Sequence, residues 1–132
     1  MREITFRGKR KDNGEWVYGD LYHDWSRLYT KPDIKIANNM GKFPVIPETV
    51  GQYTGFTDKN GKKIFEGDIL ESKYCDDEEP DGFGISHEIV KWIKGGFFAV
   101  EKDYEPDPLI LFDTDTSLIV GNIHDNPDLL EK

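Results

Sequence analysis

The apolar residues of this chain recur at alternate positions more often than at helical spacing. The runs Glu3–Arg7 and, less strictly, Glu15–Tyr18 alternate polar and apolar side chains, which is typical of strands with one buried face. Between them lies Asn13-Gly14, and an Asn-Gly pair between strand-like runs favours a type I′ hairpin turn, whose central residues need positive φ. We therefore predict a hairpin of residues 3–10 with residues 15–22 and a positive φ at Gly14.

The same pattern continues along the chain and predicts about ten short strands. A second pair, Asn60-Gly61, predicts another turn with positive φ at Gly61. The one helical signal lies at the C-terminus, where Asn126 occupies an N-cap position and Pro127 the first helical position. Beyond the first hairpin the predicted strands cover residues 27–30, 34–37, 50–54, 62–65, 68–74, 85–92, 97–101, 109–112 and 118–120.

This content predicts a mainly β protein with one short C-terminal helix. We expect a single domain over residues 1–132 in a barrel-like or SH3-like arrangement, because closure removes exposed sheet edges. With 36% hydrophobic residues, the chain can bury a core of its own.

Two stretches of the chain resemble each other, NGEWVYGDL at 13–21 and NGKKIFEGDIL at 60–70. The second copy has one extra residue, Glu66, which we interpret as a β-bulge. Asp20 and Asp68 occupy matching places after a glycine, where an aspartate in a turn accepts backbone N–H bonds. The same two carboxylates are also the residues that a hydrolase or nuclease would use as acid and base.

Other signatures of catalysis and metal binding are missing. Gly55 and Gly61 are one residue too far apart for a Walker A loop, and Lys63 stands where that motif needs a hydroxyl. The sequence has no Gly-x-Ser-x-Gly elbow, and one cysteine with three scattered histidines provides no zinc-ligand spacing. We predict no catalytic residue set, no metal site and no cofactor, and we expect Cys75 to be inert.

The distribution of charge along the chain argues against nucleic acid as a partner. A net charge of −9 repels phosphate and argues against nucleic-acid binding. Residues 75–82, CDDEEPDG, concentrate carboxylates without apolar anchors, so we expect a mobile surface loop there. No apolar run approaches the ~20 residues of a membrane span, and the N-terminus lacks the apolar stretch of a signal peptide, so we expect a cytoplasmic protein without membrane contact.

The best candidate for a binding surface is the segment 21–29, which follows the first predicted hairpin. Trp, Tyr and Arg dominate the hot spots of protein interfaces. A turn between two short strands would push Trp25 outward, so we predict that Trp25 is at least partly exposed. The alternative is that the aromatic side chains simply fill the core. The candidate contact residues are Tyr22, Trp25, Arg27 and Tyr29.

Four stretches together resemble the YopX family of bacteriophage and prophage proteins. They are MREITFRGKRKDNGEWVYGDL, IPETVGQYTGFTDKNGKKIFEGDIL, EIVKW and IVGNIHDNPDLL, and they span nearly the whole chain in the family's order. The resemblance implies a small cytoplasmic protein of phage or prophage origin with a mainly β fold. It does not imply any activity, cofactor or functional residue.

The leading hypothesis is therefore a non-enzymatic protein-binding module. Its partner would be a host or phage protein, or a second copy of the chain. One alternative is a metal-dependent hydrolase that uses the carboxylates of Asp20 and Asp68. The other is an acidic mimic of DNA, although lysines within residues 59–63 and 91–102 interrupt a continuous negative surface.

Overall fold

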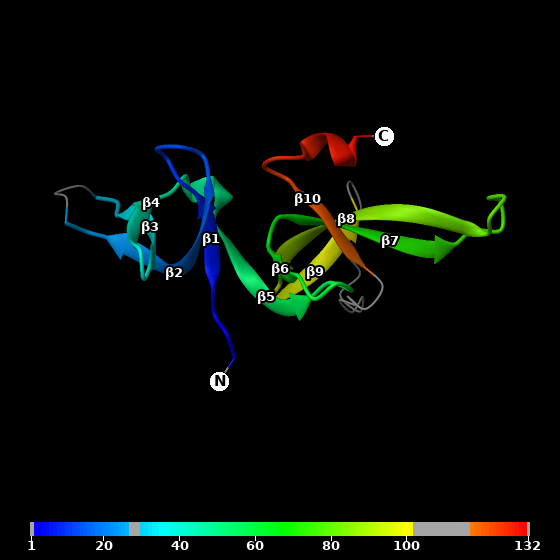
Figure 1. Ribbon diagram of the computed structural model, residues 1–132, viewed down its shortest axis with the longest axis horizontal. Coiled ribbons are helices and arrows are strands. Elements are labelled where there is room, and N and C mark those ends of the chain that lie inside the picture. The colour runs from blue at the N-terminus through cyan, green and yellow to red at the C-terminus, as the bar shows by residue number, and fades with distance from the viewer. Residues whose placement is uncertain (1, 27–29, 102–116, 132) are drawn as a thin grey trace. The chain divides into compact units, whose positions relative to one another are not determined.

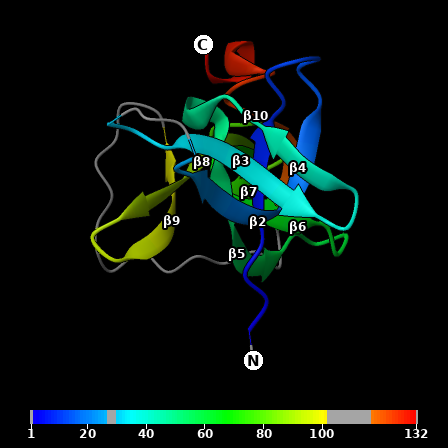
Figure 2. The same cartoon turned by 90° about the vertical axis from the view of Figure 1, so that its left-hand side faces the viewer.

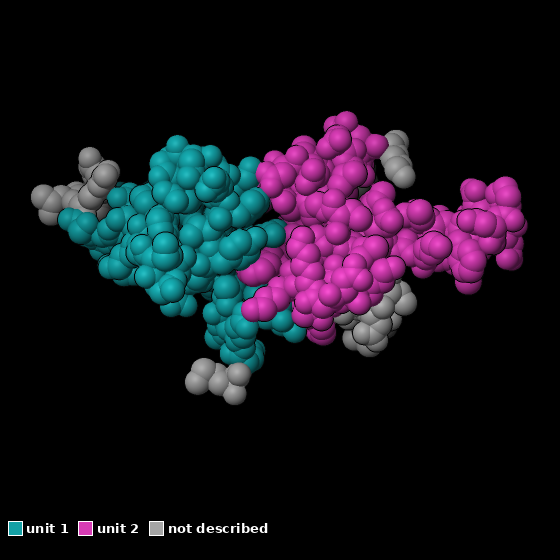
Figure 3. All heavy atoms as spheres, in the orientation of Figure 1, with its two compact units in different colours: residues 1–55 teal, residues 56–132 magenta. Residues whose placement is uncertain are grey.

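The computed structural model describes residues 2–26, 30–101 and 117–131 (Figure 1). The described residues form ten β-strands and two short 3₁₀ helices, which confirms the prediction of a mainly β fold with about ten strands. The chain divides into two compact units, residues 1–55 and residues 56–132, drawn in separate colours in Figure 3. The assignment of residues 1–132 to a single domain stays a prediction.

The first unit begins with the predicted hairpin. Strand β1 (Phe6–Lys9) pairs antiparallel with β2 (Trp16–Asp24), with Phe6 opposite Gly19 and Lys9 opposite Trp16. Gly14 has a φ of 73°, as predicted. The turn is not of type I′, because Asn13 is not among the described residues with positive φ. The loop is longer than two residues, and the Arg10 N–H donates to Glu15 O across its base at 2.9 Å.

The hairpin is extended on both sides into one antiparallel sheet. Strands β3 (Asp33–Asn38) and β4 (Gly41–Pro44) follow β2, and Figure 2 shows these three strands as neighbours. On the other side β1 pairs with β5 (Gly51–Thr57), which follows the 3₁₀ turn η1 (Pro47–Thr49). Within this unit the strand order is β4-β3-β2-β1-β5.

One face of this sheet covers the core of the first unit. Val17, Ile36 and Val45 form the buried cluster. Gly19 sits where β2 and β3 come very close, because a Cβ built there would lie 2.2 Å from the carbonyl oxygen of Ala37. Partly buried side chains surround the cluster; they are Phe6, Leu21, Ile34, Phe43 and Val50.

The second unit begins with β6 (Lys63–Phe65) and β7 (Asp68–Cys75). The chain continues through β8 (Phe83–Ile93), β9 (Gly96–Glu101), β10 (Leu118–Asn122) and the 3₁₀ turn η2 (Pro127–Leu130). Strands β7 to β10 form an antiparallel sheet in the order β10-β7-β8-β9. This unit has its own buried cluster, Ile64, Leu70 and Val90, with Ala99 and Ile119 packed against it.

The described strands form open sheets rather than a closed barrel. The two buried clusters explain the difference, because each sheet already covers apolar side chains of its own unit. The predicted strand at 109–112 and most of the one at 27–30 lie outside the described residues. The strand at 118–120 is confirmed as part of β10.

Two local predictions need correction. Glu66 is not a bulge: Glu66 and Gly67 form the turn that ends β6 and begins β7, with a φ of 88° at Gly67. The predicted C-terminal helix is the 3₁₀ turn η2, with Pro127 at its start as expected. The Asn126 side chain does not cap this turn; its Oδ1 accepts from the Asn122 N–H at 3.3 Å.

Candidate functional site

The sheet of the first unit presents an aromatic face opposite its core. Because side chains alternate along a strand, β2 directs Val17 and Leu21 to the core and Trp16, Tyr18 and Tyr22 to the other side. Tyr18 is 47% exposed and Tyr22 is 36% exposed. Pairing brings cationic residues of β1 and β4 onto the same side. We call this surface the aromatic face, defined by Arg7, Lys9, Trp16, Tyr18, Tyr22 and Lys42.

Cationic groups lie over two of these rings. The guanidinium carbon of Arg7 is 4.6 Å from the centre of the Trp16 ring, and Lys9 Nζ is 5.7 Å from it. Lys42 Nζ is 4.1 Å from the centre of the Tyr22 ring. Each such contact contributes about 0.5–1 kcal/mol at an exposed site. The exposed cation of this face is Lys42, since Arg7 is buried beneath the Trp16 ring, and the exposed carboxylate of Asp20 lies on the same side of β2. The ammonium of Lys42 over the Tyr22 ring can attract a carboxylate.

Trp25 follows the end of β2 and is 64% exposed, which confirms the predicted exposure. Its backbone is held on both sides. Asp24 Oδ1 accepts from the Ser26 N–H at 2.9 Å, while Asp24 Oδ2 accepts from Lys35 Nζ at 2.6 Å on the neighbouring strand. The hydrogen bond from Lys35, followed by those from Ser26, holds the pKa of Asp24 well below its ordinary value of 3.8. The exposed side chain of Trp25 thus lies between two residues that the Asp24 carboxylate links.

The structure describes the position of two of the four predicted contact residues. Tyr22 lies on the aromatic face, and Trp25 comes three residues after it, directly after the end of β2. Arg27 and Tyr29 lie outside the described residues. Whether any of the four contacts a partner stays a prediction.

The two matching aspartates have different structural roles. Asp68 is 2% exposed, and its Oδ2 accepts from the Phe65 N–H at 2.8 Å across the turn between β6 and β7, as predicted. Asp20 is not a turn residue: it is exposed within β2, opposite Ala37 of β3. The stretch at 13–21 has no residue that corresponds to Glu66, and β2 continues through Gly19 and Asp20 without a turn.

No metal-ligand constellation accompanies these aspartates. Across residues 2–26, 30–101 and 117–131, no group of three or more His, Cys, Asp or Glu side chains is arranged to hold an ion. Asp20 and Asp68 also belong to different compact units.

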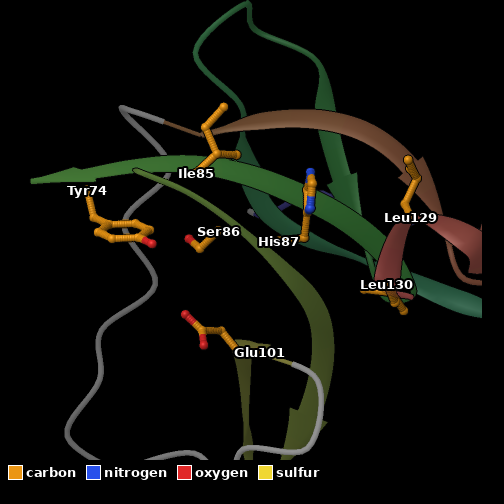
Figure 4. Close-up of a pocket in the computed structure, with 7 residues that line it drawn as sticks. All are labelled: Tyr74, Ile85, Ser86, His87, Glu101, Leu129 and Leu130. Atoms are coloured by element: carbon orange, nitrogen blue, oxygen red, sulfur yellow. The ribbon is translucent and has the colours of Figure 1, made fainter. Parts of the chain in front are cut away.

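A small open pocket of about 260 Å³ lies in the second unit, beside the β7–β8 hairpin and η2 (Figure 4). Figure 4 shows the side chains of Tyr74, Ser86 and Glu101 around one space. Its lining among the described residues is Tyr74, Ile85, Ser86, His87, Glu101, Leu129 and Leu130. The sequence did not predict this pocket, because its lining comes from positions up to 56 residues apart that no local pattern connects.

The polar groups around the pocket are tied to carboxylates. The Ser86 hydroxyl donates to Glu88 Oε1 at 2.8 Å, and His87 Nε2 lies 3.1 Å from Glu71 Oε2. Glu88 also stands directly opposite Glu101 in the β8–β9 ladder. Like charges in such a pair repel each other. The surroundings of the pocket are therefore acidic.

The acidic segment closes the far end of the same hairpin. The Asp76 N–H donates to Gly82 O at 2.9 Å, and the carboxylate oxygens of Asp76 and Asp81 accept from the backbone N–H groups of Glu78 and Phe83. Its surface position is confirmed, and Cys75 beside it is an exposed free thiol.

Charge is divided unequally between the two units. Residues 1–55 contain nine Lys or Arg against seven Asp or Glu, whereas residues 56–132 contain eight against nineteen. The whole excess of negative charge therefore lies in the second unit.

The fold defines a class of small, mainly β proteins built from two open antiparallel sheets with one-turn helices. The chain belongs to the YopX family, whose model for the YopX protein matches residues 5–131. Its fold is similar to the crystal structure of protein EF1440 from Enterococcus faecalis, with a TM-score of 0.58 and 25% sequence identity. That match covers 99% of this chain and 100% of the Enterococcus chain.

Two further findings are negative. No curated protein matches this chain. Within the described ranges, no helix has the length and apolar character needed to cross a bilayer.

Proposed function

We propose that this chain is a non-enzymatic protein-binding module that contacts its partner through Trp25 and the aromatic face. The observation that carries the proposal is the 64% exposure of Trp25, which directly follows β2 and lies beside the Asp24–Ser26 hydrogen bond. In the free protein an exposed Trp leaves a large apolar surface in contact with water. Once a partner buries it, Trp is among the side chains that contribute most to binding.

The chemistry of the aromatic face favours a partner with carboxylates. Lys42 is exposed and holds its charge above the Tyr22 ring, so an acidic group can reach it without reordering a long side chain, whereas Arg7 is only 6% exposed and supports the Trp16 ring from within. Single-stranded nucleic acid would instead need open ring faces for base stacking. Membership of the YopX family is the support for placing the partner among phage or host proteins of the cytoplasm.

The alternative of a metal-dependent hydrolase has weaker support. Asp68 is buried and already accepts from the Phe65 backbone, so its carboxylate serves the turn. The acidic mimic of DNA stays a third candidate, although the exposed Lys62, Lys91 and Lys94 interrupt the negative surface of the second unit.

Affinity capture with matched variants tests the proposal. Trp25→Ala and Tyr22→Ala should release a protein that the wild type retains from lysates of infected or lysogenic cells. Trp92→Ala is the control, because Trp92 is 55% exposed but lies in the second unit, edge-on to Phe97 at 4.8 Å. Identical retained proteins for wild type and Trp25→Ala would contradict the proposal.

A further inference from the structure

We propose that one partner of this module is a second copy of the chain, whose pocket between the β7–β8 hairpin and η2 receives Trp25. The inference rests on the proposed function and names the occupant of its contact surface. In this contact the exposed indole of Trp25 from one copy enters the pocket of another copy.

The size of the pocket is the first argument. Sites for small molecules usually enclose about 300–1,000 Å³. A pocket of about 260 Å³ that is open on one side falls below that range and suits a single large side chain. Interface hot spots are large side chains of this kind that fill a pocket in the partner.

The lining of the pocket is the second argument. Ile85, Leu129 and Leu130 offer apolar surface for the flat ring. An indole has one polar group, an N–H that can only donate. Glu101 and Ser86 carry oxygens that can accept this hydrogen bond, and both line the same space.

Charge complementarity is the third argument. Trp25 belongs to the unit with a slight excess of basic residues, and the neighbouring sheet face carries the solvent-accessible Lys9 and Lys42. The pocket lies in the unit that holds the whole negative excess, with Glu88 opposite Glu101 beside it. A cationic surface of a second copy would relieve this repulsion. Opposite charges also steer the two surfaces together and suppress like-to-like pairing.

The resulting contact is heterologous, since Trp25 and the pocket are different surfaces of the chain. A pair of copies then has one free Trp25 on one copy and one free pocket on the other, so the association continues into a ring or an open chain of copies.

Analytical ultracentrifugation over a concentration series tests the inference. Wild type and the control Trp92→Ala should associate, and higher salt should weaken the association because the contact is charge-assisted. Trp25→Ala should raise the dissociation constant about 30-fold, the factor that corresponds to the loss of a hot spot of about 2 kcal/mol. Leu129→Arg, which places a long cationic side chain in the pocket, should do the same.

Mixing the two variants separates a lost contact from a folding defect. Trp25→Ala keeps an intact pocket and Leu129→Arg keeps an intact Trp25, so an equimolar mixture should form dimers with wild-type affinity that grow no further. A mixture that stays monomeric, or a wild type that is monomeric at every concentration, would overturn the inference. If the wild type is monomeric and Trp25→Ala still releases a captured protein, the second copy is wrong and the protein-binding proposal stands.

Discussion

Replacing Asp68 should destabilise the second unit far more than replacing its sequence counterpart Asp20. In Asp68→Ala the buried N–H of Phe65 loses its acceptor at 2.8 Å. A hydrogen bond to a charged group contributes about 1.5–3 kcal/mol, and an unsatisfied buried donor costs about 1–3 kcal/mol. Both ranges describe the loss of the same hydrogen bond and are not added together, so we expect the free energy of unfolding to fall by about 2–3 kcal/mol.

Two further variants sharpen this prediction. Asp68→Asn keeps a neutral acceptor oxygen at the same place and should lose only about half as much. Asp20→Ala removes an exposed side chain from β2 and should stay within about 0.5 kcal/mol of wild type.

Urea denaturation followed by circular dichroism measures all three variants. The slope of the transition should stay unchanged, so that a shift in the midpoint reports stability alone. Equal losses for Asp20→Ala and Asp68→Ala would refute the distinction between a strand residue and a turn acceptor. A loss below about 1 kcal/mol for Asp68→Ala would show that water or another group replaces its acceptor.

Three other predictions concern local features. Gly14→Ala and Gly61→Ala should each cost about 1 kcal/mol in a urea titration, because both glycines have positive φ and nothing lies near the added Cβ; no loss at either site would contradict this. Replacing residues 76–81 by a short Gly-Ser linker should preserve a cooperative thermal melt, since loop length changes the entropy of closure slowly; a lost transition would make the carboxylates structural. The pKa of Asp24 is lowered in the folded chain, so the charged carboxylate bonded to Lys35 stabilises the fold fully above the unfolded pKa of 3.8, and this stabilisation is lost as the pH falls toward the folded-state pKa. In urea titrations between pH 7 and pH 2, Asp24→Asn should therefore lose less stability on acidification than the wild type.

Features that depend on a few neighbouring residues could be predicted from the sequence. The positive φ of Gly14 and Gly61 follows from Asn-Gly between strand-like runs, and the strand content follows from alternation. Glu66 was misread because its turn depends on distant partners. The Gly67 N–H donates to Val90 O at 2.9 Å, and Gly67 O accepts from the Ile123 N–H at 2.8 Å.

The division into two units and the pocket were beyond the reach of local patterns for the same reason. Val17 and Ile64 are both buried strand residues, but no local pattern says that they belong to separate clusters. The exposure of Trp25 was predictable because a turn after a strand is a local property. The bond between Asp24 and Lys35 beside it joins residues eleven positions apart and could not be predicted without the register of β2 with β3.

The two similar stretches at 13–21 and 60–70 each contain a Gly-Asp pair, but the two glycines are required for different structural reasons. Gly67 is required by an angle, since its φ of 88° suits a residue without a side chain or one of inverted chirality. Gly19 is required by space, since any Cβ would collide with the carbonyl of Ala37. A D-residue at Gly67 would therefore match the backbone angle, whereas L-alanine at Gly19 would force β2 and β3 apart. An alignment column that holds glycine in both copies would record two separate constraints, and a profile built from one copy would mispredict substitutions in the other.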